Sequence, residues 1–224
     1  MPGKPRHLLV LLATCLAAAG CAAPAPVPQR ESATGLTATL TTPLDIVLRW
    51  PDDPAAAGTM LEFATDPNGP YTTLQYLPPH LTTYTHPDLL PQTSFYYRIR
   101  PFSGPASAPL TDATQPATPP PAGAPAPVRT PGDAGAPVGL RSAREADGTL
   151  KFTWTDRTTD EEGFLLEQRK PGTAMFAPVE VTGANATSCK LSTLPGEEGA
   201  AYRVRAFFTG PPSPLAHQTT GARR

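Results

Sequence analysis

Two pairs of arginines have the residue type and the spacing to bind an anionic ligand. Four residues recur 105 positions apart, as Tyr97-Arg98-Ile99-Arg100 and Tyr202-Arg203-Val204-Arg205. In a β-strand, neighbouring side chains point to opposite faces, so inward-facing Tyr97 and Ile99 place both guanidinium groups outward. The pattern predicts two exposed basic pairs that could contact an anionic polysaccharide. The alternative is a solvated sheet face whose arginines are neutralised by neighbouring acids.

The sequence offers few residues for metal or catalytic chemistry. Asp160-Glu161-Glu162 has the clustered carboxylates that calcium prefers, but no spaced ligand loop surrounds it, so we expect a solvated acidic loop. The histidines lack the spacing of a metal site and are predicted on surface loops: His80, His86 and His217. No phosphate-binding glycine loop or Gly-x-Ser-x-Gly motif occurs. We therefore expect no catalytic residue, no metal and no cofactor.

Cys189 is a candidate for thiol chemistry. It ends Thr187-Ser188-Cys189, which matches Thr82-Thr83-Tyr84 in the first copy of the repeat. This position lies in a predicted strand and faces the core, so we expect a small buried hydrophobic side chain. The alternative is a reactive exported thiol.

The amino terminus has the features of a signal peptide. Lys4 and Arg6 precede an apolar stretch over 8–19, which is too short to span a bilayer. Residues 16–21, Leu-Ala-Ala-Ala-Gly-Cys, resemble the lipobox of bacterial lipoproteins. The resemblance implies that Cys21 is diacylated through its sulfur and becomes the first residue after cleavage. The alternative is an ordinary signal peptidase site followed by an incidental cysteine.

The anchor has consequences for placement. We predict a signal peptide over 1–20, followed by the lipidated Cys21 and a Pro/Ala-rich tether over 21–34. Two or three acyl chains provide stable membrane anchoring, whereas one chain binds only marginally. Ala22 after the cysteine, in place of Asp, resembles the outer-membrane sorting signal of enteric bacteria. We expect a bacterial lipoprotein of the outer membrane or cell surface rather than the inner membrane.

The rest of the chain consists of two copies of one unit, separated by prolines. Landmarks recur in pairs at nearly the same spacing: Trp50 and Trp154, Leu89 and Leu194, Pro109-Leu110 and Pro214-Leu215. Many of the 31 prolines gather in 22–30 and 115–137. We predict a first domain over 35–117, a Pro-rich linker over 118–136, a second domain over 137–220 and a tail over 221–224. A proline-rich linker of this kind is an extended, semi-rigid spacer.

Alternating apolar residues predict short strands in both units. In the first unit they fall at 46–50, 59–63, 71–76, 82–85 and 95–99, and residues 110–114 can supply the last strand. In the second unit the alternation falls at 150–154, and residues 187–189 and 202–205 match strand positions of the first unit. Turn residues separate several of them, notably Asp66-Pro67-Asn68-Gly69-Pro70 and Asp147-Gly148. Short strands with turns and no helical period predict an all-β fold.

The landmarks resemble the fibronectin type III domain. The signature residues of the first unit are Trp50, Leu89, Pro91, Thr93 and Tyr97-Arg98-Ile99, and 160–167 is similar to the second-to-third strand region of many bacterial members. The resemblance implies two tandem immunoglobulin-like (fibronectin type III) β-sandwiches joined by a Pro-rich linker. The corner tyrosine of the family falls on Phe95 and Ala200, which lack the bonding hydroxyl. We expect a somewhat less stable first domain with the same fold, and the sequence leaves the local packing around Ala200 open.

Charge argues against a nucleic-acid partner. Residues 35–117 contain three basic against seven acidic residues, and 137–220 contain nine against ten. Neither unit has the basic surface that phosphate binding needs. Besides the arginines, the candidate binding residues lie in the loops 103–106 and 209–212, which are expected to join the last two strands of each domain. They are Ser103, Gly104, Gly210 and Pro211.

The sequence predicts a membrane-anchored, non-catalytic spacer or binding module that contacts an envelope protein or polysaccharide. This interpretation rests on the anchor, the spacers and the lack of a catalytic motif, because fold alone does not specify function. One alternative is a structural subunit of an envelope or secretion assembly. The other is an accessory protein of a polysaccharide hydrolase.

Overall fold

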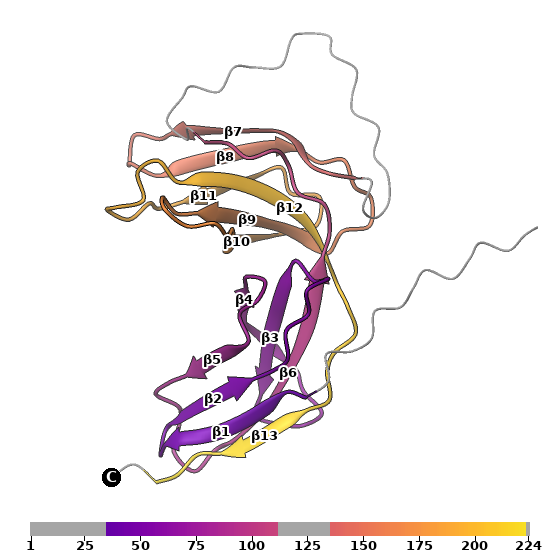
Figure 1. The fold of residues 1–224 in the computed structure, drawn as a ribbon, viewed down its shortest axis with the longest axis vertical. Helices are drawn as coiled ribbons and strands as arrows, with labels where there is room; N and C mark the ends of the chain where they lie inside the picture. Colours follow the sequence, from indigo (N-terminus) through magenta and orange to yellow (C-terminus); the bar gives the residue numbers. More distant parts are fainter. Residues whose placement is uncertain (1–34, 112–134, 223–224) are drawn as a thin grey trace, which may run out of the picture.

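The computed structural model describes residues 35–111 and 135–222, and every regular element within them is a β-strand. Figure 1 shows these strands in two groups, each a β-sandwich. The predicted all-β fold of two tandem sandwiches is confirmed. The predicted signal peptide, Cys21, the tether and most of the linker lie outside the described residues. Within the described ranges, no helix is long and apolar enough to cross a membrane.

The first sandwich is built from two antiparallel sheets. One contains β1 (Thr37–Thr42), β2 (Asp45–Arg49) and β5 (Thr83–His86). The other contains β3 (Gly58–Ala64), β4 (Thr72–Leu77) and β6 (Ser94–Ser103). One face of each sheet packs on the other, which accounts for the alternation of apolar residues. The core consists of Ile46, Leu48, Trp50, Leu61, Leu77, Leu89, Phe95, Tyr97 and Ile99.

The second sandwich repeats this arrangement. One sheet contains β7 (Val138–Arg144), β8 (Leu150–Thr155) and β11 (Ser188–Leu191). The other contains β9 (Gly163–Arg169), β10 (Ala177–Gly183) and β12 (Ala201–Thr209). Its core consists of Leu150, Phe152, Trp154, Phe164, Leu166, Ala200, Tyr202, Val204 and Ala206.

Each sandwich is closed by a segment from the other half of the chain. β13 (Ala216–Thr219) pairs antiparallel with β6 of the first sandwich (Figure 1). Residues 105–110 lie along β12 of the second sandwich, where Ala106 bridges Arg205 and Leu110 bridges Tyr202. The prediction that residues 110–114 supply the last strand of the first domain is therefore wrong. We name residues 104–110 the first crossing segment and residues 210–219 the second crossing segment.

The two crossing segments make the same hydrogen bonds. In the first, Ser107 N donates to Val204 O at 2.8 Å, and Val204 N donates to Ser107 Oγ at 3.1 Å. In the second, Ser213 N donates to Ile99 O at 2.8 Å, and Ile99 N donates to Ser213 Oγ at 3.1 Å. Each segment thus uses one serine to satisfy both backbone groups of a core strand residue.

The sequence of the crossing segments explains their course. Both begin Gly-Pro-x-Ser, at residues 104–107 and 210–213. Proline disfavours the helical conformation at the preceding residue, which favours an extended course at the start of each segment. At the crossing, Ser103 of β6 pairs with Phe208 of β12, which joins the main sheets of the two sandwiches into one sheet of order β10-β9-β12-β6-β3-β4.

Substituting Gly104 by alanine is expected to destabilise the crossing by about 3 kcal/mol. Gly104 has a φ of 130°, and a Cβ there would lie 2.0 Å from the carbonyl oxygen of Ala206. The matched control is Gly148→Ala, since Gly148 has a φ of 86° but no atom within 4 Å of its Cβ position. Denaturant unfolding of both variants separates the close approach from backbone strain alone. Equal losses in both would contradict the proposed role of the contact.

Candidate functional site

Of the eight binding residues predicted from sequence, Arg100 and Arg205 bond the segments that cross between the sandwiches, whereas Arg98 and Arg203 bond within their own sandwiches. Arg205 Nη1 donates to the carbonyl oxygen of Gly104 in the first crossing segment. Arg100 Nη1 donates to Thr209 Oγ1 at 3.2 Å and to Gly210 O at 3.5 Å. The sequence predicted that the loops 103–106 and 209–212 join the last two strands of each domain. This prediction is wrong, because both loops carry the chain from one sandwich to the other. Arg100 and Arg205 therefore support the junction.

A buried glutamate neutralises each arginine pair. Glu62 accepts from Arg98 Nε at 2.7 Å and from Arg98 Nη2 at 3.1 Å, and Arg100 Nε lies 3.4 Å from the same carboxylate. Glu62 is 6% exposed, and it faces Arg98 across the β3–β6 pair. A carboxylate so little exposed to water has lost most of its hydration, and the arginine partners offset the free-energy cost of that desolvation.

The second sandwich has the same cluster, more deeply buried. Glu167 is 1% exposed and accepts from Arg203 Nε at 2.5 Å and from Arg205 Nε at 2.7 Å. Arg205 is itself buried. The prediction of two exposed basic pairs is wrong for Arg205, and Arg98, Arg100 and Arg203 are half-buried. The alternative interpretation is correct that neighbouring acids neutralise the arginines, but the predicted solvated face is buried at Glu62, Glu167 and Arg205.

Each cluster also carries a stacked aromatic ring. The guanidinium of Arg98 lies 4.0 Å from the ring centroid of Tyr71, and that of Arg203 lies 4.2 Å from the centroid of Phe176. The stacking covers one face of each guanidinium and holds it against its glutamate. Little of either arginine is left to bind a separate ligand.

Apolar side chains pack the sandwiches against each other beside these clusters. Met60, Phe102, Leu165 and Phe207 form a separate buried cluster, and Tyr76 packs on it. The ring centroids of Tyr76 and Phe207 are 5.4 Å apart, and those of Phe102 and Phe207 are 6.5 Å apart. Met60 and Leu165 are strand neighbours of core residues Leu61 and Leu166, so they point away from their own cores. The contact therefore joins the outer faces of both main sheets.

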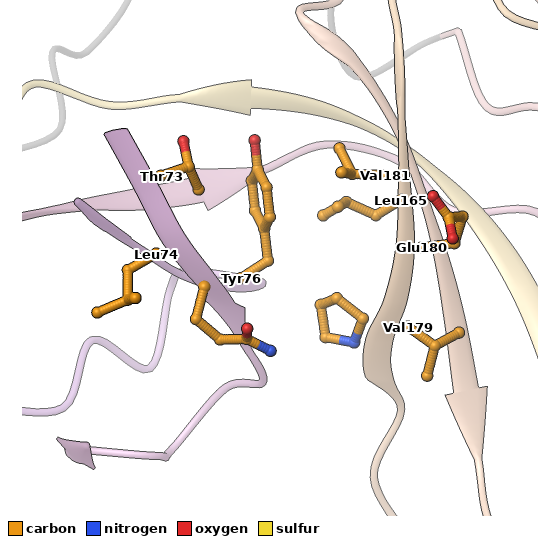
Figure 2. A pocket seen from close by; sticks show the side chains of 9 residues that line it. Thr73, Leu74, Tyr76, Leu165, Val179, Glu180 and Val181 are labelled. Atoms are coloured by element: carbon orange, nitrogen blue, oxygen red, sulfur yellow. The ribbon is translucent and has the colours of Figure 1, made fainter. Parts of the chain in front are cut away.

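A groove opens between the edge strands β4 and β10, next to this contact. Figure 2 shows Thr73, Tyr76, Leu165 and Val181 between the two strands. The cavity volume is about 390 Å³. Its lining includes one carboxylate, Glu180, and no histidine, cysteine or serine, so it lacks a paired nucleophile and base.

The groove does not favour the addition of an extended strand. The β3–β4 register shifts between Leu61 and Glu62, and the β9–β10 register shifts between Pro178 and Glu180. Bulges and proline at an exposed edge hinder pairing with a further strand. The groove is therefore suited to contact through side chains. Sequence reasoning did not find it, because it is formed by residues from both repeats.

The predicted acidic loop serves the fold. Glu162 accepts from Thr209 N and from Thr209 Oγ1, both at 2.7 Å, and so braces the end of β12. Glu161 accepts from Asn185 N at 2.7 Å and is buried, so the prediction of a solvated loop is wrong at this residue. Among residues 35–111 and 135–222, no group of three or more His, Cys, Asp or Glu side chains could hold a metal ion.

Two histidines lie in strands and not in the predicted surface loops. His86 lies in β5, and its Nδ1 is 3.0 Å from the hydroxyl of Tyr97. Burial lowers the pKa of His86 and raises the pKa of Tyr97, so both groups are favoured in their uncharged forms where they share this hydrogen bond. His217 lies in β13 and stacks on Tyr96 with ring centroids 4.6 Å apart.

Cys189 packs against the core of the second sandwich, as predicted. Burial raises the pKa of its thiol to about 12. Because only the thiolate reacts, alkylation by iodoacetamide at pH 8 is expected to be about 100- to 1,000-fold slower in the folded protein than in denaturant. The chain from residue 22 onward has no other thiol, so mass spectrometry reports this residue alone. Equal labelling rates with and without denaturant would contradict burial.

The two corner positions differ in packing. Phe95 is buried and lies 6.3 Å from Phe63 and 6.0 Å from His86, centroid to centroid. Gly199 and Ala200 instead line an open cavity of about 410 Å³ in the second sandwich. Ala200 is itself 2% exposed, so the chain covers this position without an aromatic ring.

No family model and no curated protein matches the chain. Solved structures similar to it include an Fn3-like protein from Clostridium thermocellum, with 29% identity, covering 30% of this chain and 71% of that one, at a TM-score of 0.28. A two-domain fibronectin type III segment of chicken tenascin has 14% sequence identity. The match covers 86% of this chain and 100% of that one, at a TM-score of 0.28. The FN1–FN3 domains of chicken CNTN1 have 14% sequence identity. The match covers 87% of this chain and 68% of that one, at a TM-score of 0.29. All three are fibronectin type III proteins; the fold assignment itself rests on the strand pairing described above.

Proposed function

We propose that this protein is a membrane-tethered, non-catalytic module that presents two interlocked sandwiches to a protein or polysaccharide of the bacterial cell envelope. The observation that carries the proposal is the mutual closure of the sandwiches by the two crossing segments. Mutual closure and the apolar contact give a single body with a defined groove. The lipobox-like sequence at Cys21 and the proline-rich tether supply the attachment.

The most suitable binding surface is the groove between β4 and β10. Concave sites with apolar side chains and a few polar groups are typical of ligand contact. Tyr76 and Val181 provide the apolar part, and Thr73 and Glu180 provide hydrogen-bonding groups. The arginines are less suitable, because their guanidinium groups are already held by Glu62 and Glu167.

A pull-down tests the binding role. The chain from residue 22 onward is immobilised and exposed to solubilised envelope and to purified cell-wall glycans. Val181→Asp alters the groove at a side chain that is 43% exposed, and Leu194→Asp is the matched control at a side chain that is 64% exposed. A ligand bound by the wild type and the control but not by Val181→Asp supports the groove. If no protein or glycan is retained, the binding role is contradicted and a spacer role is the remaining account.

A second measurement tests the anchor. Cys21→Ser is expected to abolish incorporation of radiolabelled palmitate and to move the protein from the membrane to the soluble fraction. Cys189→Ser is the matched control and should leave both unchanged, because Cys189 packs inside the second sandwich. Unchanged labelling in Cys21→Ser would contradict lipidation at this residue.

A further inference from the structure

The outer edge of β6 is an acceptor site for an extended strand. Gly210 N donates to Pro101 O at 2.7 Å, and Ser213 N donates to Ile99 O at 2.8 Å. Beyond these, β13 pairs with β6 from Tyr97 to Ser94. All of these bonds come from the second crossing segment, which follows the second sandwich in the chain. An unoccupied edge of this length is a template for another strand.

Side chains as well as backbone specify what fits this edge. Ser213 bonds Ile99 N, and Ala216 is buried against the first sandwich. Thr220 is buried as well; its Oγ1 accepts from Thr93 N at 2.9 Å and donates to Leu90 O at 2.6 Å. A strand that fills the site must therefore carry small or hydroxyl side chains at these three positions. A second copy of the chain carries them at the correct spacing.

The closing strand, residues 210–222, is joined covalently to the second sandwich and not to the first. The same strand of a second copy could therefore occupy the edge of β6. Residues 210–222 are attached to the second sandwich and touch the first sandwich only through non-covalent contacts. Exchange between two chains would keep the contacts made from Ser213 to Thr220 and give up those of Gly210 with Pro101 and Arg100, next to the Thr209–Phe102 pair. Exchange of identical elements is a low-cost route to dimers for this reason.

We propose that two copies of this chain exchange residues 210–222 reciprocally, so that the C-terminal strand of each copy completes the first sandwich of the other. The competing reaction is closure within one chain, for which the effective concentration of a tethered strand is on the order of 1 mM. Exchange is therefore expected when chains fold at a comparable concentration, and closure within one chain is expected in dilute solution.

A disulfide trap distinguishes the two forms. Ser94 Oγ and Thr219 Oγ1 are 3.0 Å apart on paired residues of β6 and β13. The chain from residue 22 onward, with Cys189→Ala, Ser94→Cys and Thr219→Cys, is refolded at about 1 μM and at about 1 mM, then oxidised. We expect a disulfide within one chain at the low concentration and a covalent dimer at the high concentration, measured by non-reducing electrophoresis and light scattering.

The control replaces the trap with Thr37→Cys and Arg49→Cys. These residues pair between β1 and β2, which no exchange separates, so this disulfide should stay within one chain at both concentrations. Tyr96→Cys with His217→Cys repeats the trap on the next residue pair if the first variant does not fold. A monomer alone at about 1 mM overturns the proposal. A dimer whose trap disulfide lies within one chain also overturns it, because another surface then holds the copies together.

Discussion

A chain that ends at Thr209 is expected to lose the folded first sandwich while the second sandwich stays folded. The deletion removes β13 and the bonds from Gly210 and Ser213 to β6. At about 1 kcal/mol for each hydrogen bond, and with Ile99 and Tyr97 left at an open edge, the loss is comparable with the whole stability of a small domain. The second sandwich keeps its closing strand, because residues 105–110 remain.

The two tryptophans report the two sandwiches separately. Trp50 belongs to the first core and Trp154 to the second, so Trp154→Phe and Trp50→Phe each leave one probe. Fluorescence of Trp50 is expected to shift to that of exposed indole in the truncated chain, and that of Trp154 to stay unchanged. The control chain ends at Ala222 and keeps every bond of the second crossing segment.

Two other outcomes would contradict this expectation. If residues 105–110 turned back onto β6 in the truncated chain, Trp50 would stay buried and Trp154 would become exposed. The first crossing segment would then be able to close either sandwich. If both tryptophans stayed buried, the first sandwich would fold without β13, and closure by the second crossing segment would not be needed.

Replacing Glu167 with alanine is expected to cost about 3–5 kcal/mol of stability. Glu167 is 1% exposed and accepts from Arg203 and Arg205. Its removal leaves two guanidinium groups, one of them buried, without a counter-charge. Arg205 also bonds Gly104, so the crossing loses support at the same time.

Denaturant unfolding at neutral pH measures this loss. Glu167→Gln keeps the side-chain shape and removes the charge, so it should lose most of the same stability. Glu145→Ala is the control, because Glu145 pairs with the exposed Lys190 and should leave the unfolding midpoint unchanged. A wild-type midpoint in Glu167→Ala would show that the buried cluster is dispensable.

The strands of each core could be predicted because alternation is a local property. Ile46, Leu48 and Trp50 alternate within five residues, and β2 lies at Asp45–Arg49. The identity of the closing strand could not be predicted in this way. Residues 104–107 and 210–213 both read Gly-Pro-x-Ser, yet Ser107 bonds β12 and Ser213 bonds β6. Which segment closes which sandwich depends on the folding of the whole chain, so it cannot be predicted from a short stretch of sequence.

The candidate site was predicted in part. The spacing of Arg98 and Arg100 correctly placed both on the outer face, but a single strand does not show its neighbour. Glu62 and Glu167 each precede their arginine by 36 residues, so comparing the repeats could have found both partners. The groove was beyond such a comparison, because Tyr76 and Val181 come together only when the outer faces of the sheets meet.

The crossing of the chain also determines how the protein bears mechanical load. β1 and β13 lie side by side on the first sandwich, and Gly221 N bonds Pro43 O at 2.7 Å (Figure 1). A pull between residues 35 and 222 enters through β1 and leaves through β13. The first sandwich alone transmits this tension, whereas independent domains in tandem would carry it in series. The second sandwich, with its groove edge β10, stays unloaded while the first remains folded.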